Sequence, residues 1–163
     1  MAKNPLDLAN SPVHLLRRCQ QFATDLYTKE MGKTGLTARQ FTVLQAVEQH
    51  DGASQTDLVN ATGIDRSTLA DMIARMTAKD LLARKRTEDD QRANTVRLTQ
   101  KGAKALKSSK TAVAREESQF VEALPQGKRA DFLKCLATLA DAAGELEAKG
   151  AKSAKKSKAK KRR

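Results

Sequence analysis

Apolar residues recur at intervals of three, four or seven positions along most of the chain, which predicts a mainly helical protein. Ser11 and Pro12 are typical of the start of a helix. The apolar stripe that follows consists of Leu15, Cys19, Phe22 and Leu26. A long helix over about residues 100–122 and a last helix after Pro125 carry similar stripes. These terminal helices either bury one another within one chain or form the seam of a dimer.

The middle of the chain predicts three shorter helices. A capping-box pattern at Thr37 opens a helix over about residues 38–49. Ser54 opens a third, short helix, which Gly63 ends, and a fourth helix begins near Asp65. The apolar residues expected to face inward are Phe41, Leu44, Val47, Leu69, Ile73 and Met76. Two short helices joined by a tight turn at Gly63 have the layout of a helix-turn-helix.

A β-hairpin is predicted directly after the fourth helix. Residues 82–86 form its first strand, and Val96 and Leu98 alternate with polar residues in its second strand. The connection over residues 87–94 is polar and charged. A hairpin in this position is a wing. The predicted fold class is therefore mainly α with a small β-wing, a winged helix-turn-helix with additional helices at the N- and C-terminal ends.

Charge is concentrated at the end of the chain. Seven Lys and two Arg without an acid give residues 149–163 a charge of +9, which leaves +3 of the total of +12 for the other 148 residues. The tail has nothing to bury and high like charge, so we expect it to be disordered. Nine cations favour a polyanion such as DNA, which they would bind in a salt-dependent and sequence-independent way. Another polyanion, or a merely solubilising role, is the alternative.

Several classes of protein do not agree with the sequence. Cys19 and Cys135 are far apart and in no CxxC pattern, which argues against a disulfide scaffold or a zinc module. No HExxH motif or glycine-rich phosphate loop indicates an enzyme, and we expect no cofactor and no metal. An aromatic content of 3% disfavours single-strand binding by stacking. Without a signal peptide or an apolar run of about 18 residues, we expect a cytoplasmic protein without a membrane partner.

The helix-turn-helix and the wing follow the pattern of a known family. The residues that carry it are Leu36-Thr37, Phe41 and Leu44, Gly63 to Leu69, Asp90-Gln91-Arg92, and Val96 to Gly102. Over about residues 13–146 the chain resembles the MarR family of transcriptional regulators. The resemblance implies a homodimer with one domain over residues 11–148. Its parts are dimerisation helices at about 11–32 and 100–148, and a DNA-binding lobe at about 37–99.

The sequence departs from the family pattern at three places. Asp80 stands where the family commonly has Gly after the recognition helix, and we expect the turn to survive because Asp tolerates the left-handed conformation. Gln91 replaces a frequent Arg at the wing, which weakens the expected wing contacts. Thr87-Glu88 stands in place of the common Asp-Pro at the start of the wing.

Double-stranded DNA is the expected partner. The N-terminal residues of a recognition helix meet base edges in the major groove, where an Arg such as Arg66 can donate two hydrogen bonds to guanine. Arg92 is expected to enter the minor groove, with Asp90 holding its guanidinium. The complete predicted contact set is Ser54, Gln55, Arg66, Ser67, Thr68, Arg75, Arg84, Arg86, Asp90 and Arg92. Simple capping is an equal alternative at Ser54 and Gln55, and solvated surface is the alternative for the other Arg residues.

The resemblance also implies a small-molecule pocket between the dimerisation helices and the DNA-binding lobe. The residues expected near it are His14, Arg18, Phe22 and Phe41. An Arg or a His beside aromatic rings suits an aromatic carboxylate or a phosphate-bearing derivative as effector. Packing in the core is the alternative for both Phe residues. Cys19 lies on the first-helix stripe, where an oxidant sensor is a less favoured hypothesis than inert packing.

Two functions agree with these patterns. The first is a sequence-specific transcriptional regulator, a ligand-responsive repressor that binds a pseudo-palindromic operator as a homodimer. The second is a non-specific architectural protein, because a winged helix with a Lys/Ala tail is also similar to linker histones and nucleoid-associated proteins. The architectural hypothesis predicts a monomer that binds any duplex, and the long helices at both ends favour the first.

Overall fold

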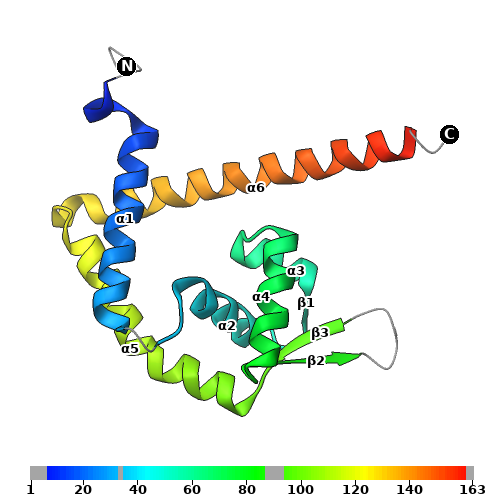
Figure 1. Cartoon of the computed structure of the whole chain (residues 1–163). Helices are drawn as coiled ribbons and strands as arrows, with labels where there is room; N and C mark the ends of the chain where they lie inside the picture. The colour runs from blue at the N-terminus through cyan, green and yellow to red at the C-terminus, as the bar shows by residue number, and fades with distance from the viewer. Residues whose placement is uncertain (1–6, 33–34, 87–93, 161–163) are drawn as a thin grey trace. The chain divides into compact units, whose positions relative to one another are not determined.

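The computed structural model describes residues 7–32, 35–86 and 94–160, with side chains described except at 85–86, 94 and 146–160. The chain divides into two units, Met1–Ala123 and Leu124–Arg163, and each is described by itself. The elements in chain order (Figure 1) are η1 (Leu8–Asn10), α1 (Pro12–Met31), α2 (Ala38–Gln49), β1 (Ala53–Ser54), α3 (Gln55–Thr62), α4 (Arg66–Ala78), β2 (Leu82–Arg86), β3 (Asn94–Leu98), α5 (Gln100–Glu122), η2 (Gln126–Lys128) and α6 (Arg129–Lys160).

Side-chain hydrogen bonds cap the helices at the N-terminal ends that the sequence predicts. At α1, Ser11 Oγ accepts a hydrogen bond from the His14 N–H at 3.4 Å. At α2, Thr37 Oγ1 accepts from the Gln40 N–H at 3.2 Å, and Gln40 Oε1 accepts from the Thr37 N–H at 3.0 Å. These bonds satisfy N–H groups that have no partner within the first turn of a helix. The predicted capping box is therefore confirmed.

The core of the first unit lies where α2, α3 and α4 meet the sheet and α5. The largest fully buried side chains are Val43, Leu44, Val47, Leu58, Leu69, Ile73, Met76, Leu82 and Leu106. Burial of one such side chain stabilises the fold by about 1.5–3 kcal/mol, so these residues hold α2, α3, α4, the sheet and α5 together. Phe41 is only half-buried and packs against this core from one side.

The sheet contains a strand that the sequence analysis did not predict. β1 pairs antiparallel with β3, with Ala53 opposite Val96, and β3 pairs antiparallel with β2, with Leu98 opposite Leu82. The strand order is therefore β1-β3-β2 (strands labelled in Figure 1). β1 has only two residues, too few to show an alternating pattern in the sequence. It ties the segment before α3 to the base of the wing.

The turn between α4 and β2 adopts the left-handed conformation at Asp80, with a φ of 57°. This confirms that Asp takes the place of Gly here. Thr99 Oγ1 donates to the Asp80 carbonyl at 2.6 Å, which ties the turn to the start of α5. A Cβ at position 102 would overlap the Leu81 carbonyl, so Gly102 lets α5 approach the turn directly.

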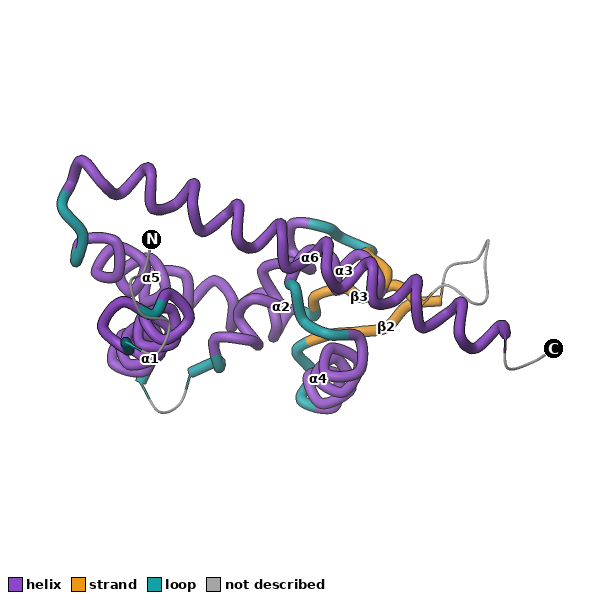
Figure 2. The backbone as a smooth tube through the Cα atoms, turned by 90° about the horizontal axis from the view of Figure 1, so that it is seen from above, coloured by secondary structure: helices purple, strands orange, loops and turns teal. Residues whose placement is uncertain are grey.

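α1 lies along α5 within the first unit, as Figure 1 and Figure 2 both show. The Glu30 carboxylate, whose side chain is 14% exposed, accepts from Gln119 Nε2 and from Arg115 Nε, both at 2.8 Å. These two hydrogen bonds lower the pKa of Glu30, and the bond from the Gln119 amide has the larger effect. Phe22 and Phe120 make a tilted ring contact with centroids 5.8 Å apart. The two long helices of this unit therefore do bury part of each other's surface.

The second unit consists of η2 and α6. α6 continues through residues 149–160, where the sequence analysis predicts a disordered tail. Ala and Lys have high intrinsic helix propensities, and Gly150 is the only residue of this stretch that strongly disfavours a helix. The last three residues, 161–163, lie outside the described part of the chain. Within the described residues, no helix combines the length and the apolar character needed to cross a membrane.

Candidate nucleic-acid interface

The helix-turn-helix is held by two local devices. Gly63 adopts the left-handed conformation with a φ of 64°, and its N–H donates to the Val59 carbonyl at 2.9 Å, which ends α3. Asp65 caps α4 by accepting from the Ser67 hydroxyl at 2.6 Å and from the Thr68 N–H at 2.9 Å. These bonds hold the pKa of Asp65 far below its usual range, and the bond from the Ser67 hydroxyl has the largest effect. The first turn of α4 is therefore fixed by the Asp65 cap.

Arg66, the first residue of α4, is exposed and held from the neighbouring helix. Its Nη2 donates to Thr56 Oγ1 of α3 at 2.8 Å. The other guanidinium nitrogens make no hydrogen bond or ion pair with the described residues. Because a guanidinium carries five N–H donors, one bond to Thr56 leaves the pair needed for a base edge. The predicted base-contacting residue is thus exposed and pre-oriented.

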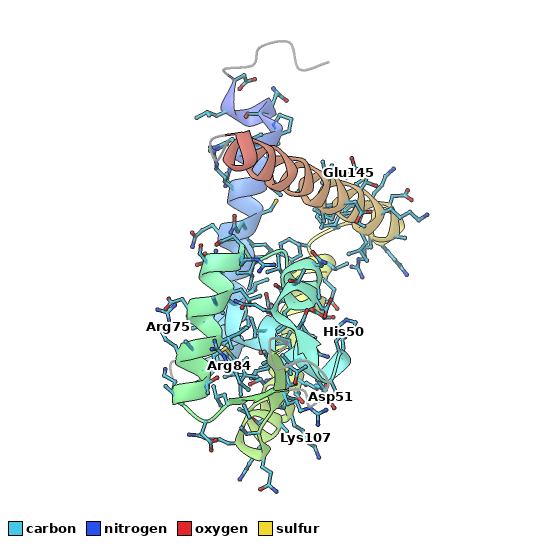
Figure 3. All side chains as sticks on the ribbon, turned by 90° about the vertical axis from the view of Figure 1, so that its right-hand side faces the viewer. His50, Asp51, Arg75, Arg84, Lys107 and Glu145 are labelled. Carbon is cyan, nitrogen blue, oxygen red and sulfur yellow. The ribbon has the colours of Figure 1, made fainter. Side chains whose placement is uncertain are left out.

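Arg75 and Arg84 are both exposed and labelled in Figure 3, Arg75 on α4 and Arg84 on β2. Arg75 Nη2 lies 2.7 Å from Asp71 Oδ2, with 67% and 63% of the two side chains exposed. An ion pair this exposed contributes little to stability, so Arg75 can exchange Asp71 for a phosphate at low cost. Thr68 is half-buried, and Ser67 is exposed beside Arg66.

Ser54 and Gln55, at the start of α3, are placed differently from a phosphate site. Ser54 caps α3: its Oγ accepts from the Asp57 N–H at 3.2 Å and donates to Asp57 Oδ2 at 2.7 Å. The two bonds from Ser54, through its hydroxyl and its N–H, lower the pKa of Asp57, so a carboxylate already occupies this helix end. The Gln55 amide nitrogen is buried and has no hydrogen-bond partner among the described residues. Of the two hypotheses for Ser54, the structure favours capping.

The predicted tip of the wing lies outside the described residues. Asp90 and Arg92 lie outside the described residues, and the backbone of Arg86 is described as part of β2 without its side chain. Their predicted contacts with the minor groove and the backbone stay predictions. The described wing residues give only its base, where β2 and β3 pair from Leu82–Leu98 to Arg86–Asn94.

Two neighbouring cavities lie where α1, α2 and α5 meet, of about 490 and 380 Å³. Tyr27, Ala38 and Glu116 line both of them. The Tyr27 hydroxyl donates to the Leu36 carbonyl at 2.7 Å, so it joins α1 to the segment before α2. Burial raises the pKa of Tyr27 to about 12, with a smaller contribution from the negative charge of Glu116. Burial, and then the charge of Glu117, raise the pKa of Glu116.

The predicted ligand residues are only partly brought together. Phe41 lines the smaller cavity. Phe22 contacts Phe120 instead, and neither His14 nor Arg18 lines either cavity as seen in one protomer. Tyr27 and Glu116 are not among the predicted ligand residues, and they lie on two helices far apart in the chain. Tyr27 follows the last residue of the predicted α1 stripe, but no sequence pattern pairs it with Glu116.

Comparisons with known proteins agree with this architecture. A family model described as MarR family matches residues 34–93. The HTH-type transcriptional repressor NicR of Pseudomonas putida is 31% identical over 138 residues, which cover 84% of this chain and 87% of NicR. The chain belongs to the MarR family. As a MarR-family member it is a transcriptional regulator with a winged-helix DNA-binding fold.

Two solved structures extend the comparison. BpsR of Bordetella bronchiseptica, whose DNA binding is regulated by 6-hydroxynicotinic acid, is 29% identical with a TM-score of 0.72, covering 78% of this chain and 96% of BpsR. The transcriptional repressor CouR, solved bound to a 23-mer DNA duplex, is 29% identical with a TM-score of 0.75, covering 84% of this chain and 97% of CouR. These MarR-family proteins therefore share nearly their whole length with the chain.

Proposed function

We propose that this MarR-family regulator is a ligand-responsive repressor that binds a pseudo-palindromic operator as a homodimer. The observation that carries the proposal is the start of α4, where Arg66 and Ser67 are exposed on a turn fixed by the Asp65 cap. A rigid, exposed first turn suits insertion into the major groove. Its relatives are regulators, and we infer that it acts in the cytoplasm without catalytic activity.

Each side chain has a proposed role at the operator. Arg66 donates two hydrogen bonds to a guanine edge, and Ser67 meets the neighbouring base. Thr68, Arg75 and Arg84 contact phosphates, which fix the register without reading sequence. For the wing we propose that Arg92 enters the minor groove, oriented by Asp90, while Arg86 contacts the backbone.

The homodimer is supported by apolar residues that each of the two units leaves exposed. On α1, Val13 and Leu16 are 58% and 50% exposed, and on α6 Leu133 and Leu139 are also exposed. We propose that a second copy covers these residues and that the dimer presents two α4 helices to successive major grooves, one helical turn apart. Selection of bound duplexes from a random pool tests this: an inverted repeat with half-sites about 10 bp apart is expected. The proposal would be contradicted if light scattering gave the molar mass of one chain in solution, or if the selected duplexes contained only a single half-site.

An effector is proposed to bind the cavities between α1, α2 and α5. The support is their size, the ring of Phe41, and the regulation of BpsR by an aromatic acid. We propose an aromatic carboxylate or a phosphate-bearing derivative, with His14 and Arg18 reaching its anionic group in the dimer and Phe22 flanking it. Thermal-shift screening of aromatic acids is expected to find a compound that raises the Tm and releases operator DNA. An Arg18→Ala variant that responds equally to that compound would exclude Arg18 as a ligand contact.

A second candidate function has one observation in its favour. The nine cations of residues 149–163 can bind any duplex through its phosphates, as in an architectural protein. This candidate predicts that binding depends on the tail and not on the DNA sequence. Removal of the tail therefore separates the two functions, because a sequence-specific regulator keeps its operator preference without it.

A further inference from the structure

A basic groove runs between the first turn of α2 and one side of α4. Its volume is about 360 Å³, and its lining includes three cations, Arg39 from α2 with Arg75 and Lys79 from the end of α4. Among the described residues, no carboxylate lines it. Thr68, from the first turn of α4, lies at the same groove, so it extends along the helix that carries Arg66.

Arg39 stands in this groove without a partner. Within the described part of the chain, its guanidinium makes no hydrogen bond or ion pair. It is exposed, and it is the second residue of α2, where the positive end of the helix dipole disfavours a cation. The helix dipole therefore disfavours this position, and no described acid lies within ion-pair distance of Arg39, although Asp65 lines a neighbouring pocket with it. A negative group supplied from outside the chain would compensate both effects.

We propose that Arg39, together with Arg75 and Lys79, binds backbone phosphates of the DNA strand that flanks the major groove beside α4. The inference rests on the proposed function, because α4 must first lie in that groove. A recognition helix in the major groove has a phosphate backbone on each side. The groove combines Arg75 and Lys79, from the C-terminal part of α4, with Arg39 from a different helix. Arg39 and Lys79 thereby join the DNA-contacting surface.

The test is a salt series of anisotropy titrations with full-length protein on its selected operator. Arg39→Ala and Lys79→Ala are expected to reduce the slope of log K against log[salt] by about 0.9 for each phosphate that the variant no longer neutralises. The preference for operator over shuffled DNA should stay unchanged, because phosphates carry no sequence information. Arg39→Lys should keep the slope, and Arg39→Ala should not lower the Tm, because an unfavourable dipole interaction disappears.

The matched control is Lys107→Ala, an exposed lysine of α5 (labelled in Figure 3) that lines neither the basic groove nor the two cavities beside α1. If Arg39→Ala and Lys79→Ala change the slope no more than this control, the groove is not a DNA contact. If they instead abolish a thermal shift caused by pyrophosphate and leave DNA binding intact, the groove takes a small phosphate ligand and the inference is overturned. Loss of operator preference in the unchanged protein is a separate result, which contradicts the proposed function alone.

Discussion

At the scale of single residues, the recognition turn is organised before DNA arrives. Asp65 fixes Ser67 and Thr68, and Thr56 holds Arg66 from the preceding helix. A side chain that is already oriented loses less conformational freedom on binding, so it contributes more affinity for the same hydrogen bonds. Thr56 thereby acts on DNA recognition through Arg66.

This role of Thr56 can be measured with Thr56→Val, which removes the hydroxyl and keeps the shape of the side chain. Loss of one hydrogen bond of ordinary net strength predicts operator affinity lower by roughly two- to tenfold. The same substitution in an Arg66→Ala background should have no further effect. An equal loss in both backgrounds would show that Thr56 contacts DNA itself and does not position Arg66.

Glu116 is a partly buried carboxylate to which no described residue donates a hydrogen bond. Its pKa is raised in the folded protein, so its protonated form is stabilising at low pH and that contribution is lost as the pH rises through the folded-state pKa. Glu116→Gln should therefore raise the Tm at pH 7, and the gain should disappear at pH values below the ordinary pKa of Glu. A gain that is independent of pH would contradict this explanation.

At the scale of elements, local signals were predictable and long-range ones were not. Caps at Ser11, Thr37 and Ser54 are recognised from three or four consecutive residues, and they place the starts of α1, α2 and α3 correctly. β1 was missed because its two residues are defined only by pairing with β3. The helix at residues 149–160 was not predicted, because high like charge and the lack of residues to bury indicated disorder, whereas Ala and Lys have high helix propensity.

The same distinction holds for the candidate site. The exposed residues at the start of α4 follow from the helix-turn-helix pattern, since the pattern itself fixes which residues come first. Tyr27 and Glu116 come from α1 and α5, and Arg39 approaches Lys79 only through the packing of α2 near α4. Proximity between residues of different helices depends on tertiary packing, and no local spacing in a single sequence predicts it.

The junction of α4, β2 and α5 depends on a missing side chain. Gly102→Ala would place a Cβ in steric overlap with the Leu81 carbonyl, which belongs to the backbone and cannot adopt another rotamer. We expect a loss of about 1–3 kcal/mol in the free energy of unfolding, typical of overpacking, measured by urea denaturation. Gly144→Ala in α6 is the matched control, because nothing lies within 4 Å of a Cβ there and Ala favours a helix. Equal stability of the two variants would show that the backbone at the junction shifts to accommodate the added methyl group.

At the scale of the whole molecule, the first unit joins a cavity to the DNA-binding lobe. The Tyr27 hydroxyl connects α1 to the Leu36 carbonyl, one residue before the cap of α2, and both residues line the larger cavity. An effector that binds there can favour a dimer whose α4 helices are no longer one helical turn apart. The proposed ligand response thus requires differential binding to two dimer geometries.

The basic tail belongs to this scale as well. Its charge adds affinity for any duplex, and its removal should lower affinity for operator and shuffled DNA by the same factor. A protein that ends at Ala148 therefore separates the contribution of the tail from that of the winged helix. A change in the ratio of the two affinities would indicate that the tail also takes part in sequence recognition.

The central claim, that the winged helix itself recognises sequence, is tested most directly by anisotropy titration of the Ala148-truncated protein on selected and shuffled duplexes across a salt series. We predict a preference of about a thousandfold or more for the selected duplex, the range of specific DNA-binding proteins. A truncated protein that binds neither duplex, beside a full-length protein that binds both equally, would contradict the claim and support an architectural role.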